Sequence, residues 1–354
     1  MRAAVLTEFG EPLEIDEVDY PEPGPEEVVV ETEACGICRS DWHAWKGDWE
    51  WMGIAPEPGQ ILGHEPAGVV AEVGGDVETL DEGDRVTVPF HLGDGTCPYC
   101  RNGQSNVCET GLPLGFVDAA QGAYAEAFAV READFNAKPL PGGVDFEEMA
   151  ALGCRFMTAY HGLADRANLR PGDTVAVHGC GGVGLSAIHI ADALGAAPIA
   201  VDVQEEKLDR ARDLGAAATV NGAEVEDVPG EVQAHNDGQG VDVSVDALGI
   251  QETAHNSVMS LGKIGTHVQI GLTEGDTAGE LSLPVDIMTL TELDFHGSYG
   301  MPLNRYDELF ELIERGVLQP AEIIGETLPL EEAPDVLASM DDFETVGIPV
   351  INEF

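Results

Sequence analysis

A glycine-rich loop between two apolar segments constrains the fold of this chain more than any other part of its sequence. Residues 179–184 read Gly-Cys-Gly-Gly-Val-Gly and fit the pattern G-x-G-x-x-G. The apolar run Thr174–His178 before the loop predicts a strand, and Val183–Leu194 after it predicts a helix. Because glycine permits the tight turn that this order needs, we expect the start of a doubly wound sheet here.

The segments that follow continue the alternation of strand and helix. Ile199–Val203 predicts a second strand, and Glu205–Leu214 predicts a helix that ends at a glycine. Val241–Asp246 and Ile264–Gly271 predict further strands. Strands that alternate with helices indicate an α/β fold with a parallel, doubly wound sheet.

The glycine loop also has a chemical meaning. Five loop residues would let a pyrophosphate approach the start of the helix: Gly179, Gly181, Gly182, Val183 and Gly184. Asp202 ends the second strand, where a carboxylate can accept hydrogen bonds from a ribose and repel a 2′-phosphate. We therefore predict that NAD is preferred over NADP. The alternative is a glycine-rich turn that binds no dinucleotide.

Residues 1–150 have a different character. Short apolar runs such as Val28–Glu31, Gly68–Val73 and Arg85–Val88 lie between clusters of Gly, Pro and Asp, which indicates a β-rich region. Near the end of the chain, Tyr306–Arg315 predicts an amphipathic helix and Ile348–Ile351 a last strand. The sequence thus predicts a β-rich domain beside the α/β domain.

The charge of the chain is unusual. Its 354 residues include 16 Lys and Arg against 66 Asp and Glu, a formal charge of −50, while 44% of them are hydrophobic. Such an apolar fraction can form a core, and such a charge argues against binding to nucleic acid or to an anionic membrane. Because molar salt shortens the Debye length to about 3 Å, we expect a protein adapted to high intracellular salt. The alternative is an ordinary acidic protein.

The cysteines and the apolar runs indicate in which cellular compartment the protein is found. No apolar run reaches about 18 residues, and the first residues predict a strand rather than a secretory signal. The seven cysteines are an odd number, which favours metal-binding or catalytic thiols over a disulfide framework. We expect a cytoplasmic protein in which Cys35 and Cys180 are packing residues.

Three cysteines lie close together in the sequence: Cys97, Cys100 and Cys108. Asp94 stands three residues before Cys97 and continues the spacing of the first two. A closed structural zinc site has four ligands, and carboxylates can serve beside thiolates. We therefore predict a structural zinc held by these four residues. The alternative is a loop that has lost its metal.

Other potential ligands are dispersed. Cys38, His64 and Cys154 have the composition of a catalytic zinc site, which keeps three protein ligands and one open position, and Glu65 follows His64. Taken alone, however, a cysteine is usually a small buried residue. The spacing does not pair these residues.

All four tryptophans lie between the first two of these residues: Trp42, Trp45, Trp49 and Trp51. They are candidates for an aromatic wall of a substrate pocket, with Trp51 as a lining residue. The alternative is that they anchor a long loop or a subunit contact.

Several motifs in order resemble one family. The segments Cys35-Gly-Ile-Cys-Arg-Ser-Asp-Trp-His43, Gly63-His-Glu-Pro-Ala-Gly68 and Leu152-Gly-Cys154, together with the cysteine-rich segment and the glycine loop, resemble the zinc-dependent medium-chain alcohol dehydrogenases. The resemblance covers essentially the whole chain. It implies a GroES-like β-rich catalytic domain at residues 1–154, a Rossmann coenzyme domain at 155–297, and a return segment, 298–354, that completes the catalytic domain.

The resemblance implies roles at the reaction centre. Three ligands would hold a zinc that stabilises the alkoxide: Cys38, His64 and Cys154. Ser40 would pass the alcohol proton, through the nicotinamide ribose, to His43. Asp41 would hydrogen-bond His64, and Glu65 would lie beside the metal.

The resemblance also implies contacts with the coenzyme and the substrate. Arg39 would contact the pyrophosphate, and Lys207 the adenosine ribose. The residues that would pack around the nicotinamide are Thr158, Ile270, Gly271 and Leu272. Phe90 matches an aromatic residue of the substrate pocket.

Three positions depart from the family pattern. Asp94 replaces a cysteine, the segment Gly297–Arg305 carries a small insertion, and Gly347 is followed by Ile348 where a basic residue is frequent. These departures affect the structural zinc, the local shape of the pocket and one phosphate contact.

The sequence thus predicts an enzyme that transfers hydride reversibly between a small-molecule alcohol and NAD, with one catalytic and one structural zinc per chain. The family implies a homodimer or homotetramer. A polyol or sugar dehydrogenase is the enzymatic alternative, although Cys154 as third ligand favours the alcohol branch. A zinc-free quinone or enoyl reductase would not need the three ligands. A dinucleotide-binding structural or sensor protein would not need Ser40 and His43.

Overall fold

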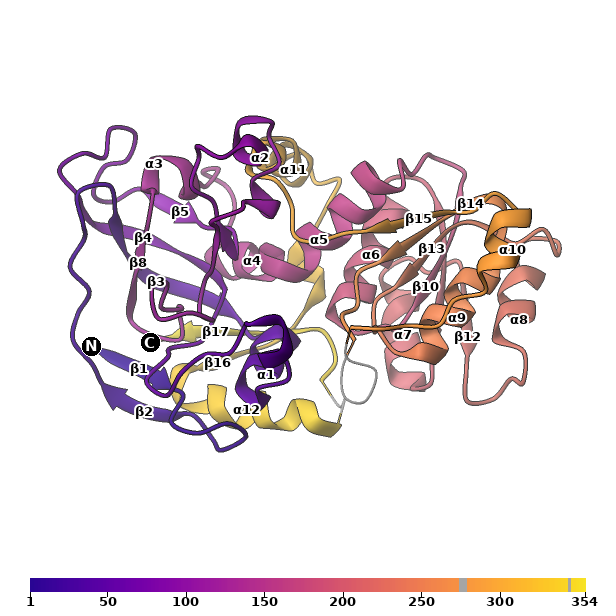
Figure 1. Cartoon of the computed structure of the whole chain (residues 1–354), viewed down its shortest axis with the longest axis horizontal. Coiled ribbons are helices and arrows are strands. Elements are labelled where there is room, and N and C mark those ends of the chain that lie inside the picture. The colour runs from indigo at the N-terminus through magenta and orange to yellow at the C-terminus, as the bar shows by residue number, and fades with distance from the viewer. Residues whose placement is uncertain (274–278, 343–344) are drawn as a thin grey trace. The chain divides into compact units, whose positions relative to one another are not determined.

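The chain folds into two compact units. The computed structural model describes residues 1–273, 279–342 and 345–354. The first unit consists of Met1–Cys154 and Gly300–Phe354, and the second unit of Arg155–Tyr299. The chain therefore leaves the first unit once and returns to it, and both termini belong to that unit (Figure 1).

A sheet of six parallel strands forms the framework of the second unit (Figure 1). Its order is β12-β11-β10-β13-β14-β15, and each neighbouring pair is parallel. The strands are β10 (Thr174–His178), β11 (Ala197–Asp202), β12 (Ala218–Asn221), β13 (Val241–Asp246), β14 (Leu261–Gln269) and β15 (Asp294–Gly297). The order reverses between β10 and β13, as in dinucleotide-binding sheets, which confirms the predicted fold class.

Most predicted elements of this unit agree with the structure. Strand β10 has the predicted bounds, and the helix after the glycine loop begins one residue earlier than predicted. Strand β14, however, begins at Leu261 rather than at Ile264. Two glycines near this start interrupt the hydrophobic pattern, and the strand is irregular there, since its register against β13 shifts and Ile264 has a φ of 65°.

A sheet of seven strands forms the framework of the first unit. Its order is β16-β17-β3-β4-β5-β9, and β8 also pairs with β3. The strands are β3 (Val28–Gly36), β4 (Glu65–Val73), β5 (Arg85–Thr87), β8 (Ala127–Val130), β9 (Lys138–Pro139), β16 (Ile324–Pro329) and β17 (Ile348–Glu353). Strand β3 runs past the predicted end at Glu31, because buried and exposed residues alternate there.

Smaller elements complete the first unit. In the hairpin of β1 (Arg2–Val5) and β2 (Glu14–Glu17), β1 is the strand predicted for the first residues. A second small pair joins β6 (His91–Leu92) and β7 (Leu112–Pro113). The C-terminal strand β17 pairs with the end of β3, where Ile351 lies opposite Cys35. The return segment therefore supports the loop that leads from β3 to Cys38.

The helices of both units are short. Those of the first unit are α1 (Arg39–Lys46), α2 (Pro98–Arg101), α3 (Ala133–Asn136), α4 (Phe146–Ala151), α11 (Tyr306–Glu314) and α12 (Ala333–Ser339). Those of the second unit are α5 (Met157–Tyr160), α6 (Gly182–Ala193), α7 (Glu205–Asp213), α8 (Val228–Ala234), α9 (Gln251–Ser260) and α10 (Val285–Leu290). In the described part of the chain, none of them has the length and apolar character needed to cross a membrane.

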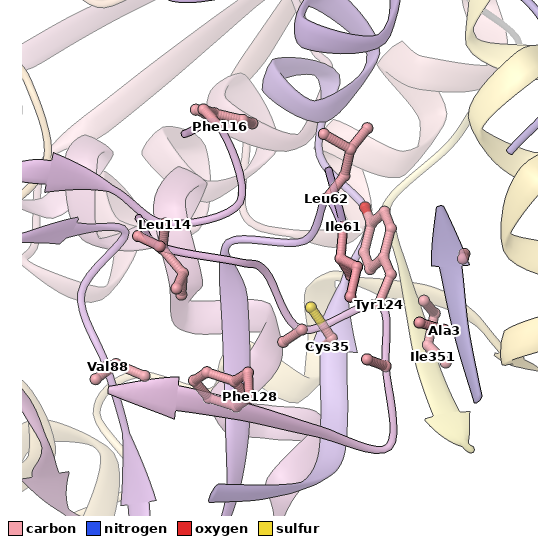
Figure 2. Close-up of a cluster of buried hydrophobic side chains, with 14 of the residues drawn as sticks. Ala3, Cys35, Ile61, Leu62, Val88, Leu114, Phe116, Tyr124, Phe128 and Ile351 are labelled. Atoms are coloured by element: carbon pink, nitrogen blue, oxygen red, sulfur yellow. The ribbon is translucent and has the colours of Figure 1, made fainter. Parts of the chain in front are cut away.

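The core of the first unit joins segments that are far apart in the sequence. Leu62, Tyr124, Phe128 and Ile351 are all buried and belong to one hydrophobic cluster, which Figure 2 shows. Burial of one such large apolar side chain contributes about 1.5–3 kcal/mol. The C-terminal strand is therefore part of the core that surrounds the predicted metal ligands.

Two histidines are buried in the second unit. Nε2 of His178, at the end of β10, lies 3.4 Å from Oγ of Ser260, and Nδ1 of His267 lies 3.1 Å from Oγ of Ser257. Burial, and then the proximity of His267, lowers the pKa of His178 from 6.5 to about 3. The folded chain therefore holds His178 as a neutral imidazole.

We expect this histidine to make the protein less stable in acid. The pKa of His178 is about 3 in the folded chain against 6.5 in the unfolded chain, so its contribution is complete above pH 6.5 and is lost as the pH falls toward 3. In that range the free energy of unfolding should fall by up to about 1.4 kcal/mol per pH unit from this residue. Denaturant unfolding in molar salt, at several pH values in this range, measures this effect. As the pH falls, the free energy of unfolding should decrease more steeply for the wild type than for His178→Asn. Parallel curves would contradict the prediction.

Candidate metal and coenzyme sites

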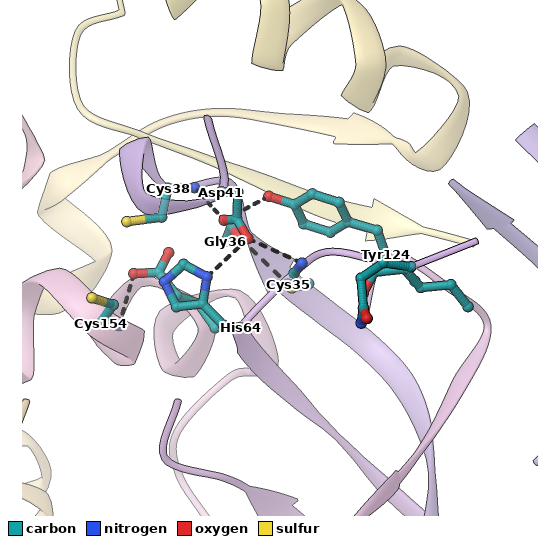
Figure 3. A network of polar contacts seen from close by, with 11 residues as sticks. Cys35, Gly36, Cys38, Asp41, His64, Tyr124 and Cys154 are labelled. Atoms are coloured by element: carbon teal, nitrogen blue, oxygen red, sulfur yellow. Dashed lines mark hydrogen bonds and ion pairs between the residues drawn. The ribbon is translucent and has the colours of Figure 1, made fainter. Parts of the chain in front are cut away.

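Four side chains that are distant in the sequence meet in the first unit: Cys38, His64, Glu65 and Cys154. One ligand atom from each residue lies within 4.8 Å of the others. Cys38 is the N-cap of α1, His64 directly precedes β4, and Cys154 lies in the bent helical segment after α4 (Figure 3). The fold thus brings together residues that their spacing does not pair.

Gly153 allows the turn that carries Cys154 to approach Glu65. A Cβ atom on Gly153 would lie 2.3 Å from Cβ of Glu65, so only glycine fits there. Oε1 of Glu65 accepts a hydrogen bond of 2.8 Å from the backbone N–H of Cys154. Glu65 therefore holds the turn that carries Cys154 and also lies within reach of a metal.

The carboxylate of Asp41 orients the group. It is fully buried, and its Oδ1 accepts from Nδ1 of His64 at 2.8 Å and from the backbone N–H of Gly63 at 3.0 Å. Its Oδ2 accepts from the backbone N–H of Cys38 at 3.0 Å and from the hydroxyl of Tyr124 at 2.9 Å (Figure 3). Because Nδ1 of His64 is the donor in this contact, Nε2 faces the group of ligand atoms.

Nε2 of His64 is the atom of this side chain to which a metal would bind. His64 is 1% exposed, and in the described part of the chain this nitrogen has no hydrogen-bond partner. Burial lowers the pKa of His64, but the charge and hydrogen bond of Asp41, together with the neighbouring Cys38 thiol, outweigh burial, so the pKa lies well above its ordinary value. The site therefore favours a positive charge at Nε2. A zinc ion among two thiols, a carboxylate and this imidazole fits that requirement.

Two further residues of this centre, Tyr124 and Phe116, carry no signal in the sequence. Burial, and then the charge of Asp41, raise the pKa of Tyr124 well above its ordinary value, so its hydroxyl remains a donor. The ring centroids of Phe116 and His64 are 4.9 Å apart. Tyr124 is 83 residues from Asp41 in the sequence, and no spacing signal connects such distant positions.

Helix α1 carries the residues with predicted roles in proton transfer and phosphate binding. Ser40 and His43 are three positions apart and therefore lie on one face of the helix. The guanidinium of Arg39 lies 4.0 Å over the ring of Trp42, and its Nη1 donates to the carbonyl of Met340 at 2.7 Å. These contacts tie α1 to the return segment of the same unit.

A second group of potential ligands lies around α2: Asp94, Cys97, Cys100 and Cys108. Their ligand atoms also lie within 4.8 Å of one another. Sγ of Cys97, the N-cap of α2, accepts from the backbone N–H of Cys100 at 3.4 Å, and Sγ of Cys108 accepts from that of Asp94 at 3.4 Å. Three thiols and one carboxylate make four ligands, which is the number that a tetrahedral zinc site needs.

The loop itself orients Asp94. Its Oδ1 accepts from the backbone N–H of Thr96 at 2.7 Å and of Cys97 at 2.8 Å, and its Oδ2 accepts from Oγ of Thr110 at 2.6 Å. The hydrogen bond from Thr110, and then the backbone N–H groups, lower the pKa of Asp94 well below its ordinary value. Burial raises the pKa of the Cys100 thiol to about 12. The carboxylate is therefore ionised and held in place, while the thiol needs a cation to lose its proton.

The predicted glycine loop connects β10 to α6. A Cβ atom on Gly184 would lie 1.8 Å from the carbonyl oxygen of Gly179, so this glycine lets α6 start against the strand. A Cβ on Gly181 would meet nothing within 4 Å, which leaves room for a phosphate at the start of the helix. Gly182 and Val183 form the first turn of α6.

Two predicted ribose contacts lie beside this loop. Oδ2 of Asp202, at the end of β11, accepts from the backbone N–H of Cys180 at 2.7 Å, and its Oδ1 accepts from that of Gln204 at 3.0 Å. Lys207 is buried on α7. The backbone of the glycine loop and of the start of α7 thus fixes the carboxylate of Asp202 at the end of β11.

The predicted nicotinamide contacts also belong to the second unit. The carbonyl of Thr158 on α5 accepts from Oγ of Ser298 at 3.2 Å. The backbone N–H groups of Ile270 and Gly271 both donate to the carbonyl of Asp246, at 3.1 and 2.9 Å. Leu272 follows them and is exposed. The segment after β14 is therefore fixed against the end of β13.

The structure separates the two residues predicted for the substrate pocket. The ring of Phe90 lies edge-on to that of His64, with centroids 5.9 Å apart. Trp51, by contrast, is 53% exposed, whereas Trp42, Trp45 and Trp49 are buried in the core. Two of the four tryptophans therefore anchor α1 itself, and Trp49 anchors the segment that follows it.

The unusual segment Gly297–Arg305 contributes to the surroundings of Phe90. Gly300 has a φ of 56°, and a Cβ there would lie 3.0 Å from the Phe90 ring. The backbone N–H of Leu303 donates to Oγ of Ser105 at 3.1 Å. The segment therefore shapes the first unit next to the candidate metal site.

Two family models match the chain. One is described as an alcohol dehydrogenase GroES-like domain and matches residues 24–141, and the other is described as a zinc-binding dehydrogenase and matches residues 182–315. The alcohol dehydrogenase of Geobacillus stearothermophilus is 35% identical over 342 residues, which are 96% of each chain. The NAD-dependent alcohol dehydrogenase of Saccharolobus solfataricus is 33% identical over 357 residues, 99% of each chain. The solved alcohol dehydrogenase TADH of Thermus sp. ATN1 has a TM-score of 0.90 and 34% identity over the full length of both chains.

We expect the same small substitution to have different effects at two glycines of the loop. Gly184→Ala should destabilise the coenzyme-free protein by about 1–3 kcal/mol, because its Cβ has no room beside the carbonyl of Gly179. Gly181→Ala, at an open position, should change the free energy of unfolding by less than about 0.5 kcal/mol. Denaturant unfolding measures both variants. Equal stabilities would show that the close approach at Gly184 is not a constraint.

Proposed function

Because the chain belongs to the family of zinc-dependent medium-chain alcohol dehydrogenases, we propose that it interconverts an alcohol and an aldehyde or ketone with NAD as its coenzyme. The observation that carries this proposal is the buried Nε2 of His64, which has no hydrogen-bond partner among the described residues and faces two thiols and a carboxylate. In this proposal, residues 1–154 and 298–354 form the catalytic domain, and residues 155–297 form the coenzyme domain.

Three residues would hold the catalytic zinc: Cys38, His64 and Cys154. When bound, the metal acts as a Lewis acid that makes the alcohol easier to deprotonate near neutral pH. Asp41 keeps the Nδ1 proton of His64 in place, which directs Nε2 to the ligand position. Glu65 holds the Cys154 turn and remains available as a further ligand.

Ser40 and His43 would carry the alcohol proton. Their spacing on α1 places the hydroxyl and the imidazole on one face of the helix, whose N-cap is Cys38. Phe90 and Phe116 would exclude water from this region, since both rings pack against His64. We also propose Trp51 as a substrate-pocket residue, although its exposure in this unit means that a substrate or another subunit would have to cover it.

The coenzyme would bind along the glycine loop of the second unit. Asp202 would accept hydrogen bonds from the adenosine ribose and would repel a 2′-phosphate, which favours NAD over NADP. Arg39 and Lys207 would supply positive charge toward the pyrophosphate and the ribose. Thr158 and the segment 270–272 would contact the nicotinamide.

Asp94 and the three cysteines of the same loop would hold a structural zinc. The support for this proposal is that all four ligand atoms lie within 4.8 Å of one another. Oδ1 of Asp94 already accepts two hydrogen bonds, but Oδ2 accepts one, from Thr110, and so keeps a lone pair for a metal, because each carboxylate oxygen can accept twice.

The charge of −50 supports adaptation to molar salt, where repulsion between exposed carboxylates is screened. A melting temperature that does not rise between dilute and molar KCl would contradict this. All seven cysteines lie in the described ranges and none of them forms a disulfide, which supports a reducing, cytoplasmic location. Recovery of the protein from an extracellular fraction would contradict this location.

The second unit would form the contact of a homo-oligomer. Strand β15 is an edge of the six-stranded sheet, and Leu290 and Val285 on the adjacent helix α10 are 83% and 64% exposed. Ile264, which is also exposed, donates its backbone N–H to the carbonyl of Thr291 at the end of that helix. Exposed edges and apolar patches of this kind favour association. A monomeric mass by light scattering in molar salt would contradict it.

We expect Cys38→Ala to lose alcohol oxidation but to retain NAD binding. Loss of a zinc ligand should reduce turnover by at least about 10³-fold, because the Lewis acid supplies several kcal/mol of stabilisation. The assay is NADH absorbance with a panel of primary, secondary and polyol substrates in molar salt, and NAD binding is followed by titration. Cys35→Ala is the matched control, because it removes another buried thiol of the same region and should leave turnover intact.

The outcomes of this experiment separate the possibilities. Absence of turnover by the zinc-loaded wild type on every alcohol would contradict the proposed function. Turnover on polyols alone would favour the polyol branch. Loss of NAD binding together with turnover in Cys38→Ala would indicate misfolding instead of a ligand role.

We expect metal analysis to assign a zinc to each ligand group. The wild type should hold two zinc ions per chain, one for each group, and Asp94→Ala should hold one, because three thiols leave the lobe without a fourth ligand. Asp94→Cys should keep both ions. An Asp94→Ala protein that still holds two zinc ions per chain would show that Asp94 is not a ligand. A wild type with a single zinc ion per chain would contradict the structural zinc at Asp94 and the three cysteines.

A further inference from the structure

The imidazole of His43 has a carboxylate partner. Nδ1 of His43 and Oδ2 of Asp48 are 2.8 Å apart. Because an ionised carboxylate only accepts hydrogen bonds, Nδ1 carries a proton in this contact and the lone pair of the neutral ring is on Nε2. Asp48 therefore selects one of the two tautomers of His43.

The end of α1 places Asp48 beside this histidine. Gly47 has a φ of 76°, in the left-handed region, and its N–H donates to the carbonyl of Ala44 at 3.1 Å. The N–H of Asp48 donates to the carbonyl of His43 at 3.0 Å, which completes the usual glycine-dependent helix end. Asp48 is thus connected to His43 twice, through its backbone and through its side chain.

Two tryptophan rings hold the imidazole in one plane. The ring of Trp49 stacks on it, with centroids 5.0 Å apart and planes at 26°, and the ring of Trp42 meets it edge-on at 4.9 Å and 75°. The side chain of His43 is 10% exposed and that of Asp48 is 29% exposed. The imidazole is therefore enclosed, and its carboxylate partner reaches the solvent.

We propose that Asp48 is a positioning residue for proton transfer, because it keeps the lone pair of His43 Nε2 ready for the proton that arrives from Ser40. This inference rests on the proposed function, in which Ser40 and His43 carry the alcohol proton. When the alcohol O–H bond breaks, its electron pair stays on oxygen and the proton forms a bond to Nε2. The imidazolium then lies beside the charge of Asp48, which stabilises it. The imidazolium returns to neutral by giving a proton to water.

A purely structural role is the competing explanation. Asp48 also closes the end of α1, so its removal can reduce stability without any effect on proton transfer. The two roles differ in one respect: a positioning residue acts only through His43, whereas a structural residue acts on the helix whether or not the imidazole is present.

The first test does not depend on turnover. Nitrogen-15 NMR of labelled histidine distinguishes protonated from unprotonated ring nitrogens, and His43→Asn identifies the His43 signals. In zinc-loaded protein at mildly alkaline pH, the wild type should show a proton on Nδ1. Asp48→Asn should keep it, because the amide oxygen still accepts, and Asp48→Ala should show the Nε2–H form. A wild-type His43 with its proton on Nε2 would overturn the proposal.

The second test is a double-mutant cycle on alcohol oxidation. Asp48→Ala should lower kcat by about tenfold or more, a part of the usual effect of a general base, with the KM for NAD unchanged. The double variant His43→Asn/Asp48→Ala should be no slower than His43→Asn alone, because Asp48 acts through the imidazole. Losses that multiply in the double variant would overturn the proposal, and so would a loss in Asp48→Asn equal to that in Asp48→Ala.

A nearby carboxylate provides the matched control. Glu50→Gln removes the same charge two positions further along, at an exposed site in the short helix after Trp49, and should match the wild type in kcat and in the His43 signals. A wild type that oxidises alcohols while Asp48→Ala does so equally well would refute this inference alone. A wild type without turnover, but with the expected Nδ1 proton, would refute the proposed function and leave the positioning of His43 established.

Discussion

The buried carboxylate of Asp41 is the interaction on which the candidate metal centre depends. It accepts four hydrogen bonds, from the backbone of Cys38 and Gly63 and from the side chains of His64 and Tyr124. A buried carboxylate without such partners carries a penalty of several kcal/mol, so these segments have to converge on it. The same convergence places the Cys38 thiol and Nε2 of His64 in one space. One satisfied buried charge therefore organises the ligand group.

Two histidine–aspartate pairs have similar geometry but differ in burial, which fits the different roles proposed for them. Nδ1 lies 2.8 Å from a carboxylate oxygen in both the His64–Asp41 and the His43–Asp48 pairs. In the first pair both side chains are fully buried, whereas in the second the carboxylate reaches water. Burial suits a nitrogen that binds a metal, because no water competes for it. Partial exposure suits a nitrogen that exchanges protons with solvent. Helix α1 supplies Asp41 to one pair and His43 to the other.

The large negative charge and the short-range contacts of these centres are compatible for a physical reason. Salt screens exposed charges beyond the Debye length, but it screens buried pairs much less. The contacts of Asp41 are buried, and the two cations proposed as coenzyme contacts are partly shielded within their own units, since Arg39 lies over Trp42 and Lys207 is buried. Molar salt can therefore relieve the repulsion of the surface without weakening the hydrogen bonds on which the proposed chemistry rests.

The sequence by itself determined the features that depend on neighbouring residues. Strand β10, the glycine loop and the cluster of Asp94 with three cysteines could be predicted, because their chemistry follows from spacing along the chain. The group of Cys38, His64 and Cys154 was expected only from a family resemblance, since spacing did not pair these residues. Tyr124 and Phe116 were not expected at all, and neither was the partner of His43, which depends on the turn at Gly47. Tertiary structure decided these contacts, because Asp41 and Tyr124 are 83 residues apart and meet only when the core of the first unit has packed around both.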